Sequence, residues 1–298
     1  MNNPKRHHFV PESYLKGFSE EKTGMLNIYS KISAVWRRQK PKKVMVRSKY
    51  YHQDSAPDGI DKNILEKMLG SSIEPKGMEA LKKLITEPDA LNEEGMADIL
   101  VYLQFQRFRV PRQADLAKAL AKSVLTRELH KTSEGREALK HSEIVIKDSF
   151  RINFMEMSHG TLTPYFSRMI WLLIEAEHGT SFITSDSPVT FHNPDVIPPA
   201  EPGPALYGTS VFFPINKRYL LALHHPEFES GEKETMEHLP KDLDIEDGQI
   251  ECRRDIIWRK DQVEWLNRLM LQYSQDLIVG ETKSALESAV GSEITGHV

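Results

Sequence analysis

The spacing of apolar residues changes near residue 170, and this change constrains the fold more than any other feature of the sequence. From about residue 60 to residue 169, apolar side chains recur at helical spacing, for example at Met96, Ile99, Leu100 and Leu103. From Trp171 onward they come in short strand-like runs, at residues 171–174, 181–184, 209–213 and 219–223. The pattern predicts an α+β protein, in which a helical middle region packs against an antiparallel sheet.

The first fifty residues predict a small additional β layer. Residues 25–29 and 34–37 form a predicted hairpin, and residues 44–46 can add a third strand. Before them, residues 11–18 predict a short helix that starts at a proline. The N-terminal β layer therefore precedes the helical region.

No linker interrupts the 298 residues, so we expect a single domain over residues 1–298 with a loose tail from residue 281. In the second half, we expect residues 171–174 to pair with residues 181–184.

The composition indicates a soluble globular protein. Apolar residues make up 39% of the chain and charged residues 28%, a balance that supports a core. The single cysteine, Cys252, cannot form an internal disulfide, and the N-terminus has no apolar signal segment. The longest apolar run is too short to span a bilayer. We therefore expect a cytoplasmic protein with no membrane partner, and the oligomeric state stays open.

Positive charge gathers in one stretch, although the net charge is −4. Residues 34–53 contain no acid and seven cations, followed by two tyrosines: Arg37, Arg38, Lys40, Lys42, Lys43, Arg47, Lys49, Tyr50 and Tyr51. A short basic segment of this kind is more often a solvent-exposed hairpin than a binding site. The alternative is a nucleic-acid-binding patch, in which Arg37, Arg38, Lys42, Lys43 and Arg47 face phosphates while Tyr50 and Tyr51 stack on bases.

Three polar motifs are candidates for chemistry. The first is the pair His7-His8 before Phe9-Val10-Pro11, and the second is Gln106-x-x-Arg109 at the end of a predicted helix. The third is Thr184-Ser185-Asp186-x-Pro188, where an apolar run ends. Polar residues at such ends often carry chemistry, and they equally often make turns or cap backbone amides.

In this order, the motifs His7-His8-Phe9-Val10-Pro11, Gln106-x-x-Arg109-x-Pro111 and Thr184-Ser185-Asp186-x-Pro188-Val189 resemble family 4238 of the domains of unknown function. The resemblance extends over residues 5–280. It implies a bacterial or phage-related protein, associated with phage defence. It implies no catalytic mechanism, so the site residues below rest on their chemistry.

The motif residues have a composition suited to phosphodiester chemistry. Arg109 can neutralise a phosphate, and Gln106 can orient a water or a base edge. His7, His8 and Asp186 can move protons or hold a divalent metal such as Mg²⁺. Ser185 is a candidate binding residue, since it lacks the glycines of a hydrolase nucleophile.

Three functions remain open from the sequence. The first is a defence effector that acts as a nuclease on DNA or RNA, and the second is an effector that processes a nucleotide or another phosphorylated metabolite. The third is a non-enzymatic sensor or binding module, in which Arg109 pairs with Asp186 or Glu74 as a structural bridge. The absence of a Walker A loop, a dinucleotide-binding glycine pattern, a zinc cysteine cluster and HExxH argues against P-loop, Rossmann and zinc-protease functions.

Overall fold

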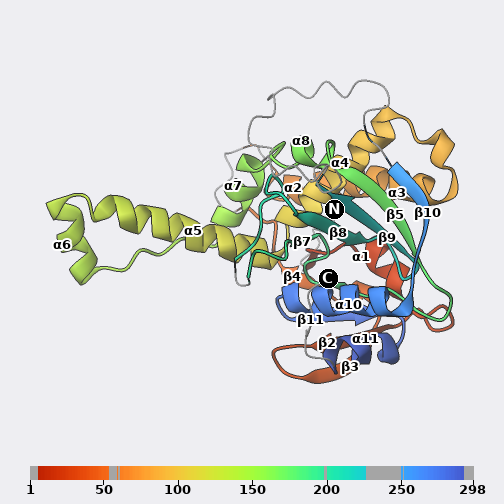
Figure 1. Cartoon of the computed structure of the whole chain (residues 1–298). Helices are drawn as coiled ribbons and strands as arrows, with labels where there is room; N and C mark the ends of the chain where they lie inside the picture. The colour runs from red at the N-terminus through yellow and green to blue at the C-terminus, as the bar shows by residue number, and fades with distance from the viewer. Residues whose placement is uncertain are drawn as a thin grey trace.

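The computed structural model describes residues 6–53, 59, 61–197, 200–225, 250 and 252–291. Within these residues, the strands form a five-stranded, a four-stranded and a two-stranded sheet. Helices of the middle region cover one face of the five-stranded sheet, and helix α10 (Lys260–Tyr273) lies between that sheet and the four-stranded one (Figure 1). The predicted α+β class is confirmed.

The five-stranded sheet has the strand order β10-β5-β9-β8-β7. The bounds are β5 Ile170–Ala176, β7 Thr190–His192, β8 Ser210–Pro214, β9 Tyr219–His224 and β10 Cys252–Trp258. Successive side chains on each inner strand point alternately into two hydrophobic cores, one on each face of the sheet. On β5, Trp171 and Leu173 face the helical region, while Ile174 and Ala176 face α10. This alternation buries both faces of the sheet.

The four-stranded sheet has the order β3-β2-β11-β6 and joins the two ends of the sequence. Its strands are β2 Leu26–Ser30, β3 Val35–Gln39, β6 Thr184–Ser185 and β11 Leu277–Gly280. Strand β11 lies between β2 and β6 and is antiparallel to both. The expected N-terminal hairpin therefore forms, but as the edge of a sheet that the C-terminal strand completes.

A two-stranded sheet carries the histidine motif. Strand β1 (Arg6–His8) pairs antiparallel with β4 (Val46–Ser48), so that His7 faces Arg47 and His8 faces Val46. Helix α1 (Glu12–Leu15) and the 3₁₀ turns η1 (Lys16–Phe18) and η2 (Pro41–Lys43) lie between these two strands in sequence.

The helical middle region consists of α2 Ile64–Met68, the π-helical turn η3 Leu69–Ile73, α3 Glu74–Thr86, the 3₁₀ turn η4 Pro88–Ala90, α4 Glu93–Phe108, α5 Pro111–Leu129, α6 Ser133–His141, α7 Phe150–Met157 and α8 Thr163–Phe166. As predicted, the Asn92 side chain caps α4 by accepting from the amide of Gly95. Helices α5 and α6 project from the body (Figure 1). The apolar residues predicted on one face of α5 are accordingly exposed: Leu116, Leu120 and Val124.

Two expectations about strand pairing are wrong, and one strand was not expected. Residues 181–184 do not pair with residues 171–174, because β5 lies between β9 and β10 while Thr184 pairs with β11. Strand β10, parallel to β5, was not expected, since Arg253, Arg254 and Asp255 give it no apolar alternation. Residues 44–46 do not extend the hairpin, because β4 pairs with β1.

The described part of the chain ends in a helix. Helix α11 (Lys283–Val290) packs against the α10 core through buried Leu286 and Ala289. The end of the expected tail, residues 292–298, lies outside the described residues.

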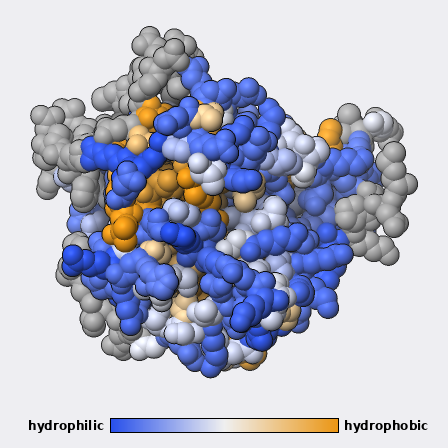
Figure 2. All heavy atoms as spheres, turned by 90° about the vertical axis from the view of Figure 1, so that its right-hand side faces the viewer, coloured by the Kyte–Doolittle hydropathy of each residue, from blue (hydrophilic) through white to orange (hydrophobic). Residues whose placement is uncertain are grey.

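The surface shown in Figure 2 is mostly hydrophilic, with one apolar area on the face that lies at the right of Figure 1. Among the described residues, the helices are all too short or too polar to cross a membrane.

Candidate functional site

The histidine motif and the Gln106–Arg109 motif meet in the structure. Arg109 Nη2 donates to the backbone oxygen of His8 at 2.6 Å. Gln106 Nε2 donates to the backbone oxygen of Phe9 at 3.3 Å. The end of α4 therefore holds the backbone that follows β1.

The third motif joins the other two through different residues. The Tyr14 hydroxyl lies 2.7 Å from Thr184 Oγ1, and Arg107 Nη1 donates to the backbone oxygen of Val189 at 2.9 Å. Arg107 also pairs with Glu201 and lies over the Phe191 ring. The three motifs are therefore neighbours, but Asp186 is not the point at which they meet.

Arg109 is the residue on which the polar site is built. Its side chain is only 2% exposed and is paired with Glu74 through Nη1 at 2.7 Å. Its Nε donates to the Tyr51 hydroxyl at 2.8 Å. With the bond to His8, these contacts hold the guanidinium in one orientation, as its planar fork allows. The sequence left two structural partners open for Arg109, Asp186 and Glu74, and the structure shows Glu74.

The position of Glu74 depends on a close approach of two helices. A Cβ atom built on Gly77 would lie 2.4 Å from the Cβ atom of Tyr102, so only glycine fits there. This contact brings the start of α3 against α4. The buried hydroxyl of Tyr102 has its pKa raised, because burial disfavours the phenolate and Glu74 adds a like charge.

Glu66 lies on the same continuous helix as Glu74, on the other side of the π-helical turn η3. In an α-helix, residues eight apart point roughly 80° apart around the axis. A π-helical turn contains more residues than an α-turn and reduces that angle. Burial raises the pKa of Glu66 to about 7, with Glu74 adding to the shift and Arg109 opposing it.

The ring of His8 has one nitrogen, Nε2, without a hydrogen-bond partner among the described residues. Burial lowers the pKa of His8, and the Pro41 backbone and the charges of Glu12 and Glu74 oppose this shift. The lowered pKa favours the neutral ring, which can accept a proton.

These groups form what we call the Arg109 centre: His8, Tyr51, Glu66, Glu74, Tyr102, Gln106 and Arg109. Four of its buried polar atoms have no hydrogen-bond partner in the described part of the chain: His8 Nε2, Glu66 Oε2, Tyr102 Oη and Gln106 Oε1. Buried polar atoms are nearly always paired in folded proteins. His8, Glu66 and Glu74 are each partly exposed, so the centre reaches the surface. Unpaired polar atoms gathered beside the surface are typical of a site that binds a polar ligand.

His7 has a structural position beside this centre. Its Nδ1 accepts the backbone N–H of Tyr51 at 2.9 Å, and its ring stacks on that of Tyr51 at 5.7 Å. As expected for adjacent residues in a strand, the two histidines face different surroundings. His8 alone of the pair belongs to the Arg109 centre.

Ser185 and Asp186 make turns and caps. The Asp186 carboxylate accepts three backbone amides, from Gln275 at 2.8 Å, Asp276 at 2.8 Å and Leu277 at 2.9 Å. Burial raises the pKa of Asp186, and the three amide donors oppose this shift. Buried Ser185 accepts the amide of Ser187. Asp186 thus stabilises the connection between α10 and β11, and Ser185 stabilises the turn after β6. Neither has a contact with the Arg109 centre among those observed.

The basic segment separates into two parts. Arg37 and Arg38 lie on β3, where Arg38 pairs with Glu20. Lys42 and Lys43, on η2, and Arg47, on β4, are exposed beside the strand of His8. The second part is therefore the one near the Arg109 centre.

Tyr50 and Tyr51 do not offer ring faces for stacking on bases, because both are buried. The guanidinium groups of Arg47 and Arg151 lie over the Tyr50 ring, at 5.8 Å and 4.8 Å from its centroid. Tyr51 instead contacts Arg109 through its hydroxyl. Burial raises the pKa of this hydroxyl to about 12.

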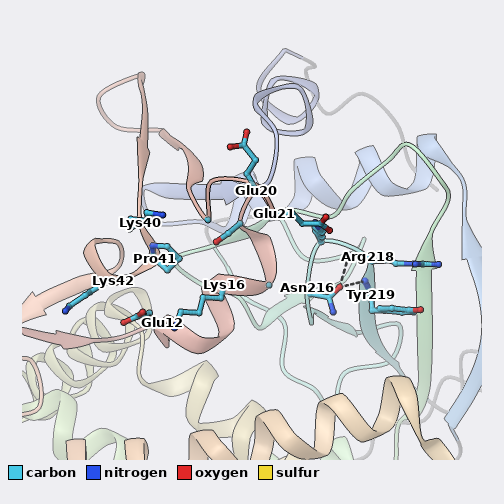
Figure 3. Close-up of a pocket in the computed structure, with 14 residues that line it drawn as sticks. Glu12, Lys16, Glu20, Glu21, Lys40, Pro41, Lys42, Asn216, Arg218 and Tyr219 are labelled. Atoms are coloured by element: carbon cyan, nitrogen blue, oxygen red, sulfur yellow. Dashed lines mark hydrogen bonds and ion pairs between the residues drawn. The ribbon is translucent and has the colours of Figure 1, made fainter.

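A cavity of about 810 Å³ is lined by Lys42 of the basic segment, but not by the residues of the Arg109 centre. Its wall includes Glu12 and Pro41, the residues whose charge and carbonyl act on His8. Figure 3 shows Glu12, Lys16 and Lys42 on one side of this cavity and Arg218 and Tyr219 on the other. Lys42 has no ion pair or hydrogen bond through its ammonium within the described residues, whereas Lys16 pairs with Glu12.

Glu66 and Glu74 belong to the centre although they lie at the edge of an apolar stripe, where glutamates are usually solvated. The sequence between them, Leu69-Gly70-Ser71-Ser72-Ile73, contains poor helix formers and is the one local signal of an irregular turn. Within the described ranges, no set of three His, Cys, Asp or Glu side chains is arranged to hold a metal ion.

Comparison with known proteins gives one match. The model of a family described as "Protein of unknown function (DUF4238)" matches residues 6–284. No curated protein and no solved structure gives a significant match.

Proposed function

Because the chain belongs to the DUF4238 family, whose description names no activity, we propose a function from the Arg109 centre: the protein is a nuclease that cleaves phosphodiester bonds. The observation that carries the proposal is a pair of unpartnered buried atoms, His8 Nε2 and Glu66 Oε2, in the surroundings of one arginine–glutamate pair. Each is a group that transfers protons, and neither has a structural partner that occupies it.

Their protonation states suit acid–base catalysis near neutral pH. His8, with its lowered pKa, is a neutral base at pH 7. Glu66, with a pKa of about 7, still holds a proton in a large fraction of molecules. A base and an acid in these states can remove a proton from a nucleophile and give one to a leaving group.

Arg109 is a positioning residue in this proposal. Three of its N–H groups are engaged, by Glu74, Tyr51 and the His8 backbone. Its charge opposes the rise in the pKa of Glu66 and lowers that of His8. Removal of Arg109 would therefore alter both proton carriers together.

Positive charge beside the centre supports a polyanionic substrate. Lys42, Lys43 and Arg47 are exposed next to the strand of His8. Exposed cations neutralise phosphates of a nucleic-acid backbone without reading its sequence. A cavity whose wall includes Pro41 and Lys42 is of the size of ordinary ligand sites.

We also propose that this activity serves defence against phage, as the family resemblance implies. Such an effector would damage host nucleic acid when expressed without its regulation. Expression of the protein is induced in host cells, and DNA and RNA from the same culture are resolved. This experiment tests the proposed role in defence independently of cleavage assays with purified protein.

The direct test is cleavage by purified protein of folding confirmed by circular dichroism. Wild type is incubated with single- and double-stranded DNA and RNA, with EDTA and with Mg²⁺. We expect cleavage by wild type, and a loss of at least 100-fold in His8→Gln and in Glu66→Gln. His130→Gln, at an exposed position after α5, is the matched control. Intact polynucleotides under all conditions would overturn the proposal, and turnover of free nucleotides alone would favour a metabolite-processing enzyme.

A further inference from the structure

We propose that helix α5 is an interaction surface for a second copy of this chain, and that the two α5 helices pair antiparallel with Leu120 at the centre of the contact. This pairing is independent of the nuclease function proposed above. Its basis is an exposed apolar stripe on α5, together with the symmetry of that stripe about the middle of the helix.

The side of α5 that contacts the rest of the chain carries lysines. Lys118 Nζ lies 3.2 Å from a carboxylate oxygen of Asp148, and Lys122 Nζ lies 2.6 Å from one of Glu143. The segment that follows α6 therefore lies along this side. Both lysines are two positions from Leu120 in sequence, which places them about 160° from it around the helix axis. The ion pairs and Leu120 are thus on opposite sides of α5.

The other side of α5 is apolar and exposed. Leu116, Leu120 and Val124 recur at every fourth residue, within about 40° on either side of Leu120. Their exposed fractions are 38%, 67% and 41%, and α5 projects from the body of the protein (Figure 1). An amphipathic helix normally turns such a stripe toward a core. Exposed apolar side chains that are contiguous rather than scattered mark a protein–protein contact.

The symmetry of the stripe favours a second copy as its occupant. The helix extends from Pro111 to Leu129, so Leu120 is its middle residue. Leu116 and Val124 lie four positions before and after Leu120. A two-fold antiparallel pair places Leu120 against the partner's Leu120, and Leu116 against the partner's Val124. One surface then serves both copies, as a two-fold interface requires.

The residues beside the stripe also permit close pairing. Ala117 and Ser123, three positions on either side of Leu120, lie about 60° from it around the axis. Both side chains are small and uncharged, so two helices can approach closely without placing like charges at the centre of the contact. The antiparallel orientation sets the positive end of each helix dipole beside the negative end of the other.

The pairing brings the tip of each α5 beside the base of the other. Full overlap sets Leu129 next to the partner's Pro111, along a helix about 28 Å long. A contact of this length and about 10 Å in width is smaller than the roughly 800 Å² that each partner contributes to a standard interface. We therefore expect a reversible dimer, whose population rises with protein concentration.

The first test uses cysteine variants of the full-length protein in which the native Cys252 is replaced by serine. Under mild oxidation, we expect Leu120→Cys to form a disulfide-linked dimer, because the two-fold axis brings residue 120 of both copies together. Leu116→Cys and Val124→Cys should each stay unlinked alone and should link when the two proteins are mixed. Linkage of Leu116→Cys alone to the same extent as in the mixture would overturn the antiparallel arrangement.

A second test measures the mass of the full-length protein by analytical ultracentrifugation over a range of concentrations. We expect wild type to dimerise, and Leu120→Glu to raise the Kd of the dimer at least about 10-fold, since a charge replaces a buried leucine. Ile257→Glu changes an apolar side chain of similar exposure, 63%, on β10 and is the matched control. It should dimerise like wild type, and thermal denaturation confirms that all three proteins are folded.

Two outcomes of this measurement would overturn the pairing. The first is a wild type that stays monomeric at every concentration, which would leave the stripe on α5 to a different partner. The second is a Leu120→Glu protein that dimerises like wild type, which would place the contact elsewhere on the surface. Neither outcome depends on whether the protein cleaves nucleic acid.

Discussion

The Nη2 atom of Arg109 lies 2.6 Å from the backbone oxygen of His8, although 101 positions separate the two residues in sequence. The same guanidinium binds Glu74 and the Tyr51 hydroxyl. One side chain thus connects the histidine strand, the tyrosine after β4, and helices α3 and α4. Stability and site geometry therefore depend on the same residue.

Loss of Arg109 should destabilise the protein strongly. Arg109→Met leaves the partly buried Glu74 without its partner, and breaking a buried pair typically costs about 3–5 kcal/mol. Urea denaturation measures the free energy of unfolding. Arg127→Met, at a highly exposed position on α5, is the control and should change it by less than about 0.5 kcal/mol. An Arg109→Met protein as stable as wild type would contradict the account of the centre.

Asp186→Asn should reduce stability without reducing the activity of the folded fraction. The amide can accept with only one oxygen, so at least one of the three backbone donors loses its acceptor, at about 1–3 kcal/mol each. The measurement is urea denaturation together with cleavage per folded molecule. Asp195→Asn, an exposed position, is the control. A variant of unchanged stability but without cleavage would instead give Asp186 a part in the chemistry.

Reversal of charge at Lys42 and Lys43 should weaken binding of single-stranded nucleic acid. If both contact phosphates, the slope of log K against log salt should fall by about 1.4. Fluorescence anisotropy over a salt series measures this slope. Lys82→Glu together with Lys147→Glu makes the same change of net charge at exposed positions elsewhere. Equal weakening in both double variants would show that only net charge matters.

The rate of cleavage should peak below pH 7, between the lowered pKa of His8 and the pKa of Glu66. Activity requires neutral His8, whose pKa is lowered from its usual value, and protonated Glu66, whose pKa is about 7. The charged groups around them are Glu12, Glu74 and Arg109. The rate should fall above pH 7 as Glu66 ionises, and fall on the acid side as His8 becomes protonated. Values of kcat/KM from pH 4.5 to 9 give the profile, and a rate still rising at pH 9 would exclude Glu66 as the acid.

Glu66 should also make stability depend on pH. Its pKa is about 7 in the folded protein and near 4.5 when unfolded, so the folded state binds more protons between these values. The free energy of unfolding should therefore decrease as the pH rises from about 4.5 to 7. Glu66→Gln should lack this decrease and gain relative to wild type at pH 8. Thermal denaturation at pH 5 and pH 8 measures the difference, and parallel behaviour of the two proteins would contradict the raised pKa.

The sequence predicted the elements better than their partners. Local signals located α4, with its Asn92 cap, and the pair β8 and β9. Strand pairing between distant segments, such as β11 between β2 and β6, leaves no trace in local periodicity. Strand β10 was missed because a register shift and the positive φ of Asp255 interrupt its pattern.

The sequence likewise predicted only part of the site, because contacts between distant residues leave no local signal. The Arg109–Glu74 bridge was one of two alternatives, and the structure shows it. Asp186, the expected acid, turned out to cap backbone amides, a use that its place before x-Pro equally allowed. Glu66 could not be found, because its position depends on a π-helical turn that no residue type encodes clearly.

That turn lets the site tolerate a change of chain length. Deleting one residue from Gly70-Ser71-Ser72 would allow η3 to become ordinary α-helix without breaking the helix from Ile64 to Thr86. The two glutamates would then be seven positions apart, and residues seven apart on an α-helix point only about 20° apart around the axis. Glu74 would keep its bond to Arg109, and Glu66 would stay on the same side of the helix. A relative with such a deletion would therefore keep the fold and both carboxylates at the centre, with a regular helix in place of the π-helical turn.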